Sequence, residues 1–267
     1  MKRFSSLLFL FFLLTTSLFP QEVYKLNWTS ESIQLGSALA LEIAADQIST
    51  SIKPLTLAEI SSLDKNSINS FDRSAVNNWN TKAGSLSNVT LGLNFIAPAI
   101  LLFGERGRKE LTTGITMYSE TMLYALAVNQ ITKMLVKRTR PYNYNSTVSS
   151  SEKTTLDARL SFYSGHTTIS FASAVFLCKT FSDYYPDSKA KPYVIGFSLA
   201  TAALTGYLRY ESGNHFPTDI ITGAVVGSAI GYFVPYFHKT SPASETSDKV
   251  SFNAAASPMG IGFVVIF

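Results

Sequence analysis

Cysteine, histidine and charged residues are all scarce in this 267-residue chain. The single cysteine, Cys178, excludes an intramolecular disulfide, and its place in an apolar run favours a small buried residue. One cysteine and three histidines are too few for the common zinc or iron–sulfur ligand sets, so we expect no metal ion and no cofactor. Charged residues make up 15% of the chain, whereas about 25% is usual in soluble domains.

The charge balance argues against a nucleic-acid partner. The net charge is +4, and Lys2 with Arg3 contributes two of those charges, which leaves +2 for the rest. So small an excess does not predict a nucleic-acid surface. The 46% hydrophobic content and the length allow one sizeable core.

The first 21 residues have the layout of a secretory signal. Lys2 and Arg3 precede a short apolar run at 7–14, and a polar exit follows. Phe19 and Pro20 are not the small residues that favour cleavage, so an uncleaved signal anchor is the alternative to a cleaved signal peptide. Either interpretation predicts an exported protein.

The next 63 residues divide into a helix and a polar excursion. Residues 22–33 are expected to be extended or a loop, and 34–49 have helical periodicity. Glu42 and Asp46 lie on one face of that helix, so it should not sit bare in lipid. Residues 50–84 are expected to form a surface excursion with short helices and no evident chemistry.

Apolar helices follow from residue 85. The stretches are 86–104, 111–136, 166–181, 192–208 and 217–237. They are rich in small residues, which let helices approach closely in a membrane or in a tightly packed soluble bundle. We predict an all-α bundle of about six core helices in a domain at 85–240, with some segments near the length that spans a bilayer. The tail at 241–267 ends in a strand-like run from Gly262 to Phe267.

Loop charges suggest an orientation if the bundle is embedded in a membrane. Arg106, Arg108 and Lys109 lie between the first two apolar stretches. If these cations are cytoplasmic, loops 137–165 and 209–216 face outward and loop 183–191 faces inward.

Three short segments carry candidate chemistry. The first runs from Lys133 to Arg140 and Pro141; the seven-residue spacing predicts two cations on one helical face, before the proline ends the helix. With two further cations between them, this segment could also be a simple juxtamembrane basic cluster. The second is Ser164-Gly165-His166 at a helix start, where free backbone N–H groups suit a phosphoryl oxygen.

The third segment contains Arg209, His215 and Asp219. A carboxylate four residues after a histidine can fix the imidazole tautomer and make the other nitrogen nucleophilic, although Pro217 places the helix start between them. Such a pair alone could equally be a structural hydrogen bond. The third histidine, His238, is expected at the surface or at a helix C-terminus. Together the three segments supply cations, two histidines and a carboxylate for attack on phosphate without a metal.

These segments resemble the motifs of the type 2 phosphatidic acid phosphatase superfamily, which includes lipid phosphatases, bacterial acid phosphatases and vanadium haloperoxidases. The family pattern is Lys, six residues, Arg-Pro; then Pro-Ser-Gly-His; then Ser-Arg, five residues, His, three residues, Asp. The sequence matches it over about residues 85–237 and departs at two neighbours of the site, where Tyr163 stands for Pro and Leu208 for Ser.

The resemblance implies a role for each matching residue. His215 would attack phosphorus, Asp219 would orient it, and His166 would protonate the leaving oxygen and then activate water. The phosphoryl oxygens would be bound by Lys133, Arg140, Arg209, Ser164 and the Gly165 N–H.

The expected function is hydrolysis of a phosphate ester or pyrophosphate on a lipid, with the bilayer as partner and the site facing the periplasm or outside. The alternatives are a soluble exported acid phosphatase acting on small phosphoesters and a vanadate-dependent haloperoxidase. Residues 142–160 could form a lid over the site or a plain surface loop.

Overall fold

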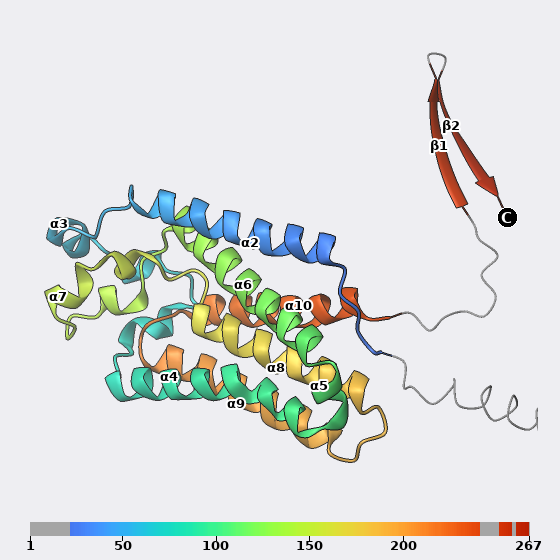
Figure 1. Ribbon diagram of the computed structural model, residues 1–267. Helices are drawn as coiled ribbons and strands as arrows, with labels where there is room; N and C mark the ends of the chain where they lie inside the picture. Colours follow the sequence, from blue (N-terminus) through green and yellow to red (C-terminus); the bar gives the residue numbers. More distant parts are fainter. Residues whose placement is uncertain (1–21, 241–250, 258–259, 267) are drawn as a thin grey trace, which may run out of the picture.

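Six long helices form an elongated bundle (Figure 1). The computed structural model describes residues 22–240, 251–257 and 260–266, so the predicted signal at 1–21 lies outside the described residues. The long helices are α2 (Trp28–Ser49), α4 (Thr81–Ile96), α6 (Leu111–Val136), α8 (Gly165–Tyr184), α9 (Lys191–Glu211) and α10 (Pro217–His238). The predicted all-α bundle of about six core helices is confirmed.

Short elements connect the long helices. They are α3 (Leu57–Ser61), η1 (Lys65–Ser67), η2 (Arg73–Asn77), η3 (Ala97–Phe103), α5 (Glu105–Lys109), η4 (Pro141–Tyr144), α7 (Ser150–Lys153) and η5 (Leu156–Arg159). In the tail, β1 (Ser251–Ser257) pairs antiparallel with β2 (Gly260–Ile266). The strand-like run expected at the C-terminal end therefore has a partner strand that the sequence pattern did not reveal.

The first helix starts earlier than the apolar periodicity predicts. Residues 22–33 were expected to be extended or a loop, but α2 begins at Trp28. The side chain of Asn27 accepts a hydrogen bond from the N–H of Thr29, and Glu31 accepts one from the N–H of Asn27 at 2.5 Å. These caps satisfy backbone groups at the helix start, so a polar first turn can be helical without apolar spacing.

The closest packing in the bundle is between α8 and α10. Gly223, Gly227 and Gly231 recur every fourth residue along the face of α10 that meets α8. A Cβ atom at Gly227 would lie 2.2 Å from the carbonyl oxygen of Thr168, and one at Gly231 would lie 2.3 Å from that of Ala172. The two helices therefore touch backbone to backbone, and both begin at the same end of the molecule (Figure 1).

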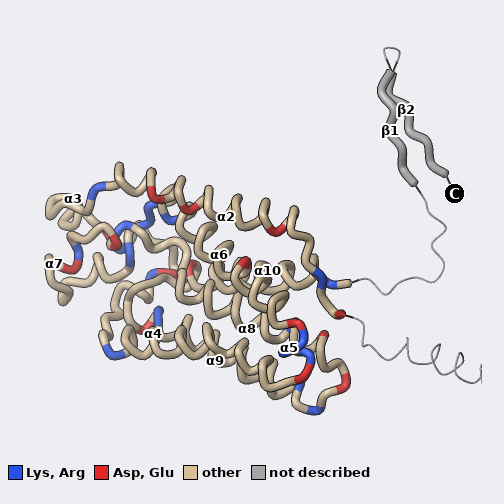
Figure 2. The backbone as a smooth tube through the Cα atoms, viewed as in Figure 1, with Lys and Arg blue, Asp and Glu red and all other residues tan. Residues whose placement is uncertain are grey.

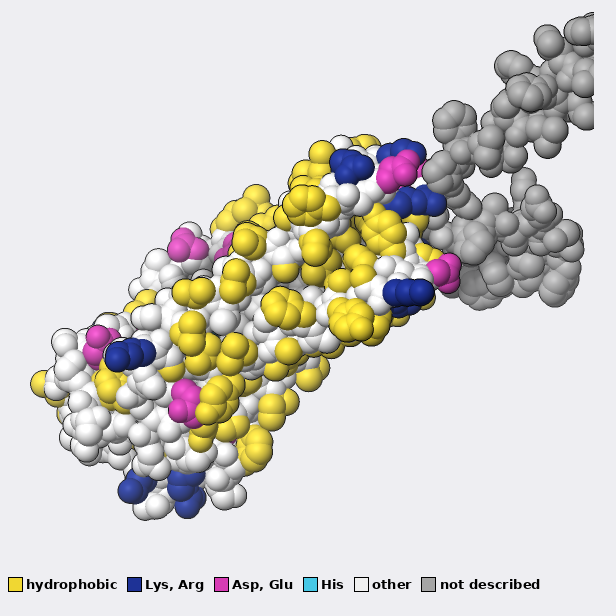
Figure 3. Space-filling view, turned by 90° about the horizontal axis from the view of Figure 1, so that it is seen from below, with side chains coloured by type: hydrophobic (Ala, Val, Ile, Leu, Met, Phe, Trp, Pro, Cys, Tyr) yellow, Lys and Arg dark blue, Asp and Glu magenta, His cyan; other side chains and the backbone are white. Residues whose placement is uncertain are grey.

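Charged residues gather towards the two ends of the bundle. Figure 2 shows this distribution along the chain, and Figure 3 shows apolar side chains spread over the middle of one face. Large apolar side chains such as Phe197 on α9 and Val225 on α10 are exposed. Two stretches, Thr81–Phe103 and Pro217–His238, are long and apolar enough to cross a membrane, with mean hydropathy 1.7 and 1.6.

The two polar segments of the chain lie at one end of the bundle and α5 lies at the other (Figure 1). The excursion expected at 50–84 contains α3, η1 and η2, but its last four residues belong to the long helix α4, which begins at Thr81. Residues 141–160 contain η4, α7 and η5, and Arg159 there forms an ion pair with Glu59 of α3. The basic α5 thus lies opposite the end that holds the predicted outward-facing loops.

The α8–α10 contact can be tested with Gly227→Ala. The added methyl group would meet backbone rather than a flexible side chain, and overpacking costs about 1–3 kcal/mol. We expect a lower Tm in detergent-solubilised protein. Gly36→Ala on α2 is the matched control, because nothing lies within 4 Å of its Cβ position and alanine favours a helix by about 1 kcal/mol. An unchanged or raised Tm for Gly227→Ala would contradict the close contact.

Candidate active site

The candidate site lies where the N-termini of α8 and α10 meet. The backbone N–H of Ser164, just before α8, donates a hydrogen bond of 3.1 Å to the carbonyl oxygen of Asp219 in the first turn of α10. As Pro217 indicated, α10 begins between His215 and Asp219. His215 and Asp219 are both buried, with exposed fractions of 1% and 0%.

The hydrogen-bonding groups around His215 define its neutral tautomer. Its Nε2 lies 3.3 Å from Nη1 of Arg140. A guanidinium group only donates, so Nε2 must present its lone pair and Nδ1 must carry the proton. Nδ1 faces Oδ2 of Asp219 at 3.6 Å. The imidazole is therefore turned with its nucleophilic nitrogen towards the cations and its N–H towards the carboxylate.

Asp219 is held from several directions. Its Oδ1 accepts a hydrogen bond of 2.6 Å from Nη1 of Arg138. Its Oδ2 accepts from Oγ of Ser161 at 2.5 Å and from the N–H of Phe216 at 2.9 Å. With both oxygens occupied, the carboxylate has a fixed position beside His215.

Arg138 links this carboxylate to the polar excursion. Its Nη2 donates to Oδ2 of Asp72 at 2.8 Å, and its guanidinium lies 4.0 Å from the ring centre of Phe216. Asp72 also accepts from the N–H and hydroxyl of Thr218. Burial alone would raise the pKa of Asp72, but the hydrogen bonds from Arg138 and Thr218 outweigh it and hold that pKa below its usual value. Asp72, in the segment 50–84 where the sequence showed no evident chemistry, thus contacts the candidate site through Arg138.

The first motif does not lie on one helix as its spacing predicted. Helix α6 ends at Val136, because Lys137 adopts the left-handed conformation with φ 52° and ψ 40°. Arg140 follows in extended backbone and turns back to the site. Its Nη2 donates to Oδ1 of Asp157 at 2.6 Å, and its Nη1 donates to the carbonyl oxygen of Asn214 at 3.1 Å. Arg140 thus reaches the site from a turn after the helix, not from two helical turns beyond Lys133.

The second motif forms a helix N-terminus directed at the site. Ser164 is the N-cap of α8, and its Oγ accepts hydrogen bonds from the N–H and the hydroxyl of Thr167. The N–H of Gly165 belongs to the first turn, where backbone donors have no intrahelical partner. A Cβ atom at Gly165 would lie 2.8 Å from Oδ1 of Asn129 and 3.8 Å from Nζ of Lys133. The close approach of α8 to α6 at Gly165 brings Lys133 to the helix start.

His166 and Arg209 each have a partner on α4. Nε2 of His166 lies 2.8 Å from Oδ1 of Asn88. Because a carbonyl oxygen accepts, this nitrogen carries the imidazole proton. Nη1 of Arg209 donates to Oγ of Ser87 at 3.3 Å. Neither α4 residue belongs to a recognised motif.

The charges around His215 show that the predicted residues come together. Burial lowers the pKa of His215 well below its usual value, and the charges of Arg140, Arg209, Lys133 and His166 lower it further. The imidazole is thus neutral, and its lone pair is available to an electrophile at neutral pH.

Two departures from the family motifs leave these contacts in place. Tyr163 is buried, and its carbonyl oxygen accepts a hydrogen bond of 2.8 Å from Nδ2 of Asn129. Leu208 is buried beside Arg209 in α9. The sequence reasoning missed several supporting residues: Asp72, Ser87, Asn88, Asn129, Arg138 and Ser161. Arg138 was noted only as one of the cations between Lys133 and Arg140, without this role. Asn129 also has a sequence signal, because it lies four residues before Lys133 and so shares its helical face.

An apolar groove of about 300 Å³ starts beside the acid candidate. Its lining includes Asn88, the partner of His166, and continues along α4, α6 and α8. The lining residues are Asn88, Leu91, Gly92, Phe95, Ile96, Met122, Leu126 and Ile169. Phe95 and Ile96 also line a second apolar cavity of about 240 Å³ further towards α5. The two hollows thus follow the bundle away from the site.

Known proteins similar to this chain are phosphatases. An undecaprenyl-diphosphatase of Sulfolobus acidocaldarius is 29% identical over 144 residues, which is 54% of this chain. The chain spans 63% of the length of that relative. A PAP2-type phosphatidylglycerolphosphate phosphatase from Bacillus subtilis, whose crystal structure is described as transmembrane, is 20% identical with a TM-score of 0.47, over 75% of this chain and 94% of that one.

The family comparison covers the site itself. Residues 114–243 match the model described as the PAP2 superfamily. This range includes α8, α9, α10 and nearly all of α6, and it contains all eight residues that the motifs singled out. The similarity to the PAP2 superfamily therefore covers the helices that carry the candidate residues.

Proposed function

We propose that this protein is a phosphatase that hydrolyses a phosphate ester or pyrophosphate of a membrane lipid through a phosphohistidine at His215. The observation that carries the proposal is the orientation of His215. Its Nε2 lone pair faces Arg140, and its Nδ1 faces the fixed carboxylate of Asp219. A neutral imidazole in a ring of cations is suited to attack an anionic phosphoryl group.

In the first step, Nε2 of His215 forms a bond to phosphorus as the bond to the leaving oxygen breaks. The imidazolium that results is stabilised by Asp219. His166 acts as an imidazolium, a form that the negative charge of a bound phosphate favours, and gives one of its two N–H protons to the leaving oxygen, which departs as an alcohol or as a lipid monophosphate. Lys133, Arg140 and Arg209 neutralise the phosphoryl oxygens as charge spreads over them, so no step requires a metal.

In the second step, His166, now a neutral imidazole, takes a proton from water and returns to the imidazolium form. The water oxygen attacks phosphorus, the bond from phosphorus to Nε2 breaks, and inorganic phosphate leaves. The hydroxyl of Ser164 and the N–H of Gly165 support the phosphoryl group in both steps through the positive end of α8.

The apolar groove supports a lipid substrate. It begins at Asn88, so a leaving group protonated by His166 would continue directly between α4 and α6. The exposed apolar side chains in the middle of the bundle and the two span-length helices support a position in the bilayer. With the basic α5 on the inner side and an N-terminal export signal, the site would face the periplasm or the outside.

His215→Ala and His166→Ala test the two roles separately. We expect His215→Ala to abolish phosphate release and to acquire no label from a ³²P-labelled substrate. His166→Ala should release phosphate about 10²–10⁴-fold more slowly while retaining an acid-labile, base-stable label. Lys137→Ala, which removes an exposed cation near the site, is the control and should retain activity. Normal turnover by His215→Ala would exclude the mechanism.

A substrate panel tests the lipid assignment. Gly92→Trp fills the groove away from the reacting groups, so kcat/KM for a polyprenyl or diacyl phosphate should fall by at least about tenfold. Its activity on a short water-soluble phosphate ester serves as the internal control and should be unchanged. If the wild type hydrolyses both substrate types equally well, the protein is a broad-specificity phosphatase instead.

Arg138→Met tests whether Asp219 must be held in place. The change leaves Asp219 and Asp72 buried without their shared cation, and breaking such a pair costs about 3–5 kcal/mol. We expect a lower Tm and a larger effect on kcat than on KM, because Arg138 positions His215 through Asp219 and does not touch phosphate. Arg73→Met is the control, because Arg73 bonds to backbone carbonyls only. A normal kcat in Arg138→Met would refute this positioning role.

A further inference from the structure

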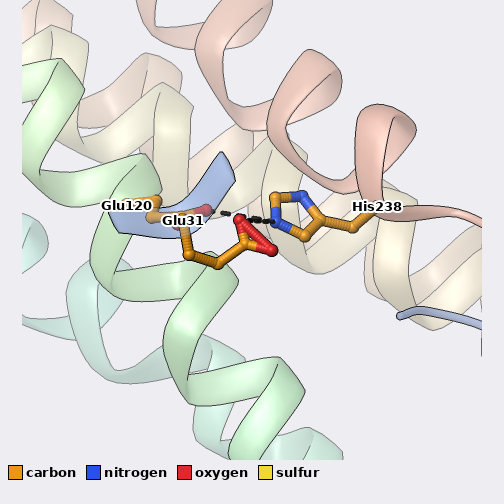
Figure 4. Close-up of side chains that lie close together, drawn as sticks. All are labelled: Glu31, Glu120 and His238. Atoms are coloured by element: carbon orange, nitrogen blue, oxygen red, sulfur yellow. Dashed lines mark ion pairs between the residues drawn. The ribbon is translucent and has the colours of Figure 1, made fainter. Parts of the chain in front are cut away.

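A second cluster of ionisable side chains lies at the opposite end of α10 from His215. Glu31 of α2, Glu120 of α6 and His238 of α10 converge there (Figure 4). All three are buried. Of the two positions expected for His238, the helix C-terminus is confirmed, because it is the last residue of α10, and the surface position is wrong. One ligand atom from each residue lies within 4.8 Å of the other two. With 22 residues in α10, this cluster is about 33 Å from the phosphatase site.

His238 presents a lone pair to the two carboxylates. Its Nδ1 lies 2.8 Å from the carbonyl oxygen of Val234, which can only accept, so Nδ1 carries a proton. The other nitrogen, Nε2, lies 3.3 Å from Oε2 of Glu120 and 3.5 Å from Oε2 of Glu31. In the neutral imidazole, three electron-rich atoms therefore face one another in a buried space.

The buried carboxylate of Glu120 makes this cluster energetically unfavourable without a further positive charge. It has no exposed surface, and neither of its carboxylate oxygens has a hydrogen-bond partner within the described part of the chain. An unsatisfied buried carboxylate is among the most unfavourable groups in a protein interior. Glu31 is better satisfied, because it accepts hydrogen bonds from the N–H of Asn27 and the side chains of Ser30 and Gln34.

We propose that Glu31, Glu120 and His238 bind a divalent metal ion of the Zn²⁺ class. Two carboxylates with a neutral imidazole balance a charge of +2. Ligand atoms about 2.1 Å from a tetrahedral Zn²⁺ lie about 3.4 Å from one another, and the two distances from Nε2 are 3.3 and 3.5 Å. A ligating histidine commonly donates its other N–H to a backbone carbonyl, as His238 does to Val234.

Protonation is the alternative way to neutralise the cluster. An imidazolium would direct its Nε2–H along a hydrogen bond to one carboxylate. Nε2 instead lies nearly equidistant from the two carboxylates and forms no hydrogen bond to either. This placement suits ligands around a shared ion better than a donor and its acceptor.

The ion would fasten α2 to the bundle. Helix α2 packs mainly on α6, and Glu31 lies in its first turn beside the last turn of α10. Coordination would join three helices at a point that touches no group of the hydrolytic site. The expected effect is therefore on stability and not on the chemical step.

The experiment uses the full-length protein in detergent, stripped with a chelator and titrated with Zn²⁺ by calorimetry and thermal unfolding. We expect one equivalent to bind and Tm to rise by about 5–10 °C at a hundredfold excess over Kd. Co²⁺ in place of Zn²⁺ should give the visible absorption of a tetrahedral site. Glu120→Gln should weaken Zn²⁺ binding by more than about 100-fold, whereas His215→Ala should bind normally.

Asp46→Asn is the matched control, because it removes an exposed carboxylate from the same helix as Glu31 and should leave binding unchanged. If Glu120→Gln does not fold, His238→Gln provides the same comparison. The proposal is overturned if the wild type binds no Zn²⁺ or if the cluster variants bind it as tightly as the wild type. A Glu120→Gln protein with a higher Tm and no metal in the wild type would identify a proton-sharing cluster.

Discussion

The arrangement of the candidate active site depends on one buried carboxylate. Asp219 accepts hydrogen bonds from Arg138, Ser161 and the N–H of Phe216, and it faces Nδ1 of His215. A buried carboxylate is stable only when its oxygens are satisfied. The partners that stabilise Asp219 also fix its direction, and that direction sets which imidazole nitrogen of His215 faces the cations. Stability and the proposed reactivity thus rest on the same hydrogen bonds.

The contact between α8 and α10 places the proposed acid and nucleophile. Glycines along α10 let the two helices touch through their backbones, and the Ser164–Asp219 hydrogen bond joins their first turns. Side-chain packing can adjust by rotamer changes, but backbone contact leaves little freedom to slide. The helix starts that carry His166 and Asp219 are therefore held at a fixed separation, as a reaction through two positioned groups requires.

The helical bundle and the grouping of the eight motif residues could be predicted from the sequence, because both depend on patterns along the chain. Apolar runs reveal helices, and the three motifs have definite spacings. It could not predict Asp72 or Asn88, since nothing near either residue marks its contact with Arg138 or His166, more than 60 residues away. The single-helix interpretation of Lys133 and Arg140 failed because the left-handed Lys137 is a local event. The expectation that no metal ion binds was based on the numbers of cysteines and histidines. It therefore did not consider the two glutamates that tertiary packing brings to His238.

The ion pair between Arg138 and Asp72 connects the polar excursion to the candidate active site. The excursion lies outside the range that matches the family model, and its residues belong to none of the three motifs. Sequence drift there would go unnoticed by anyone who judges relatives by their motifs alone. A relative could keep every motif residue and still lose the contacts that support Asp219. The motifs therefore identify the proposed reacting groups but not all of the residues that hold them in position.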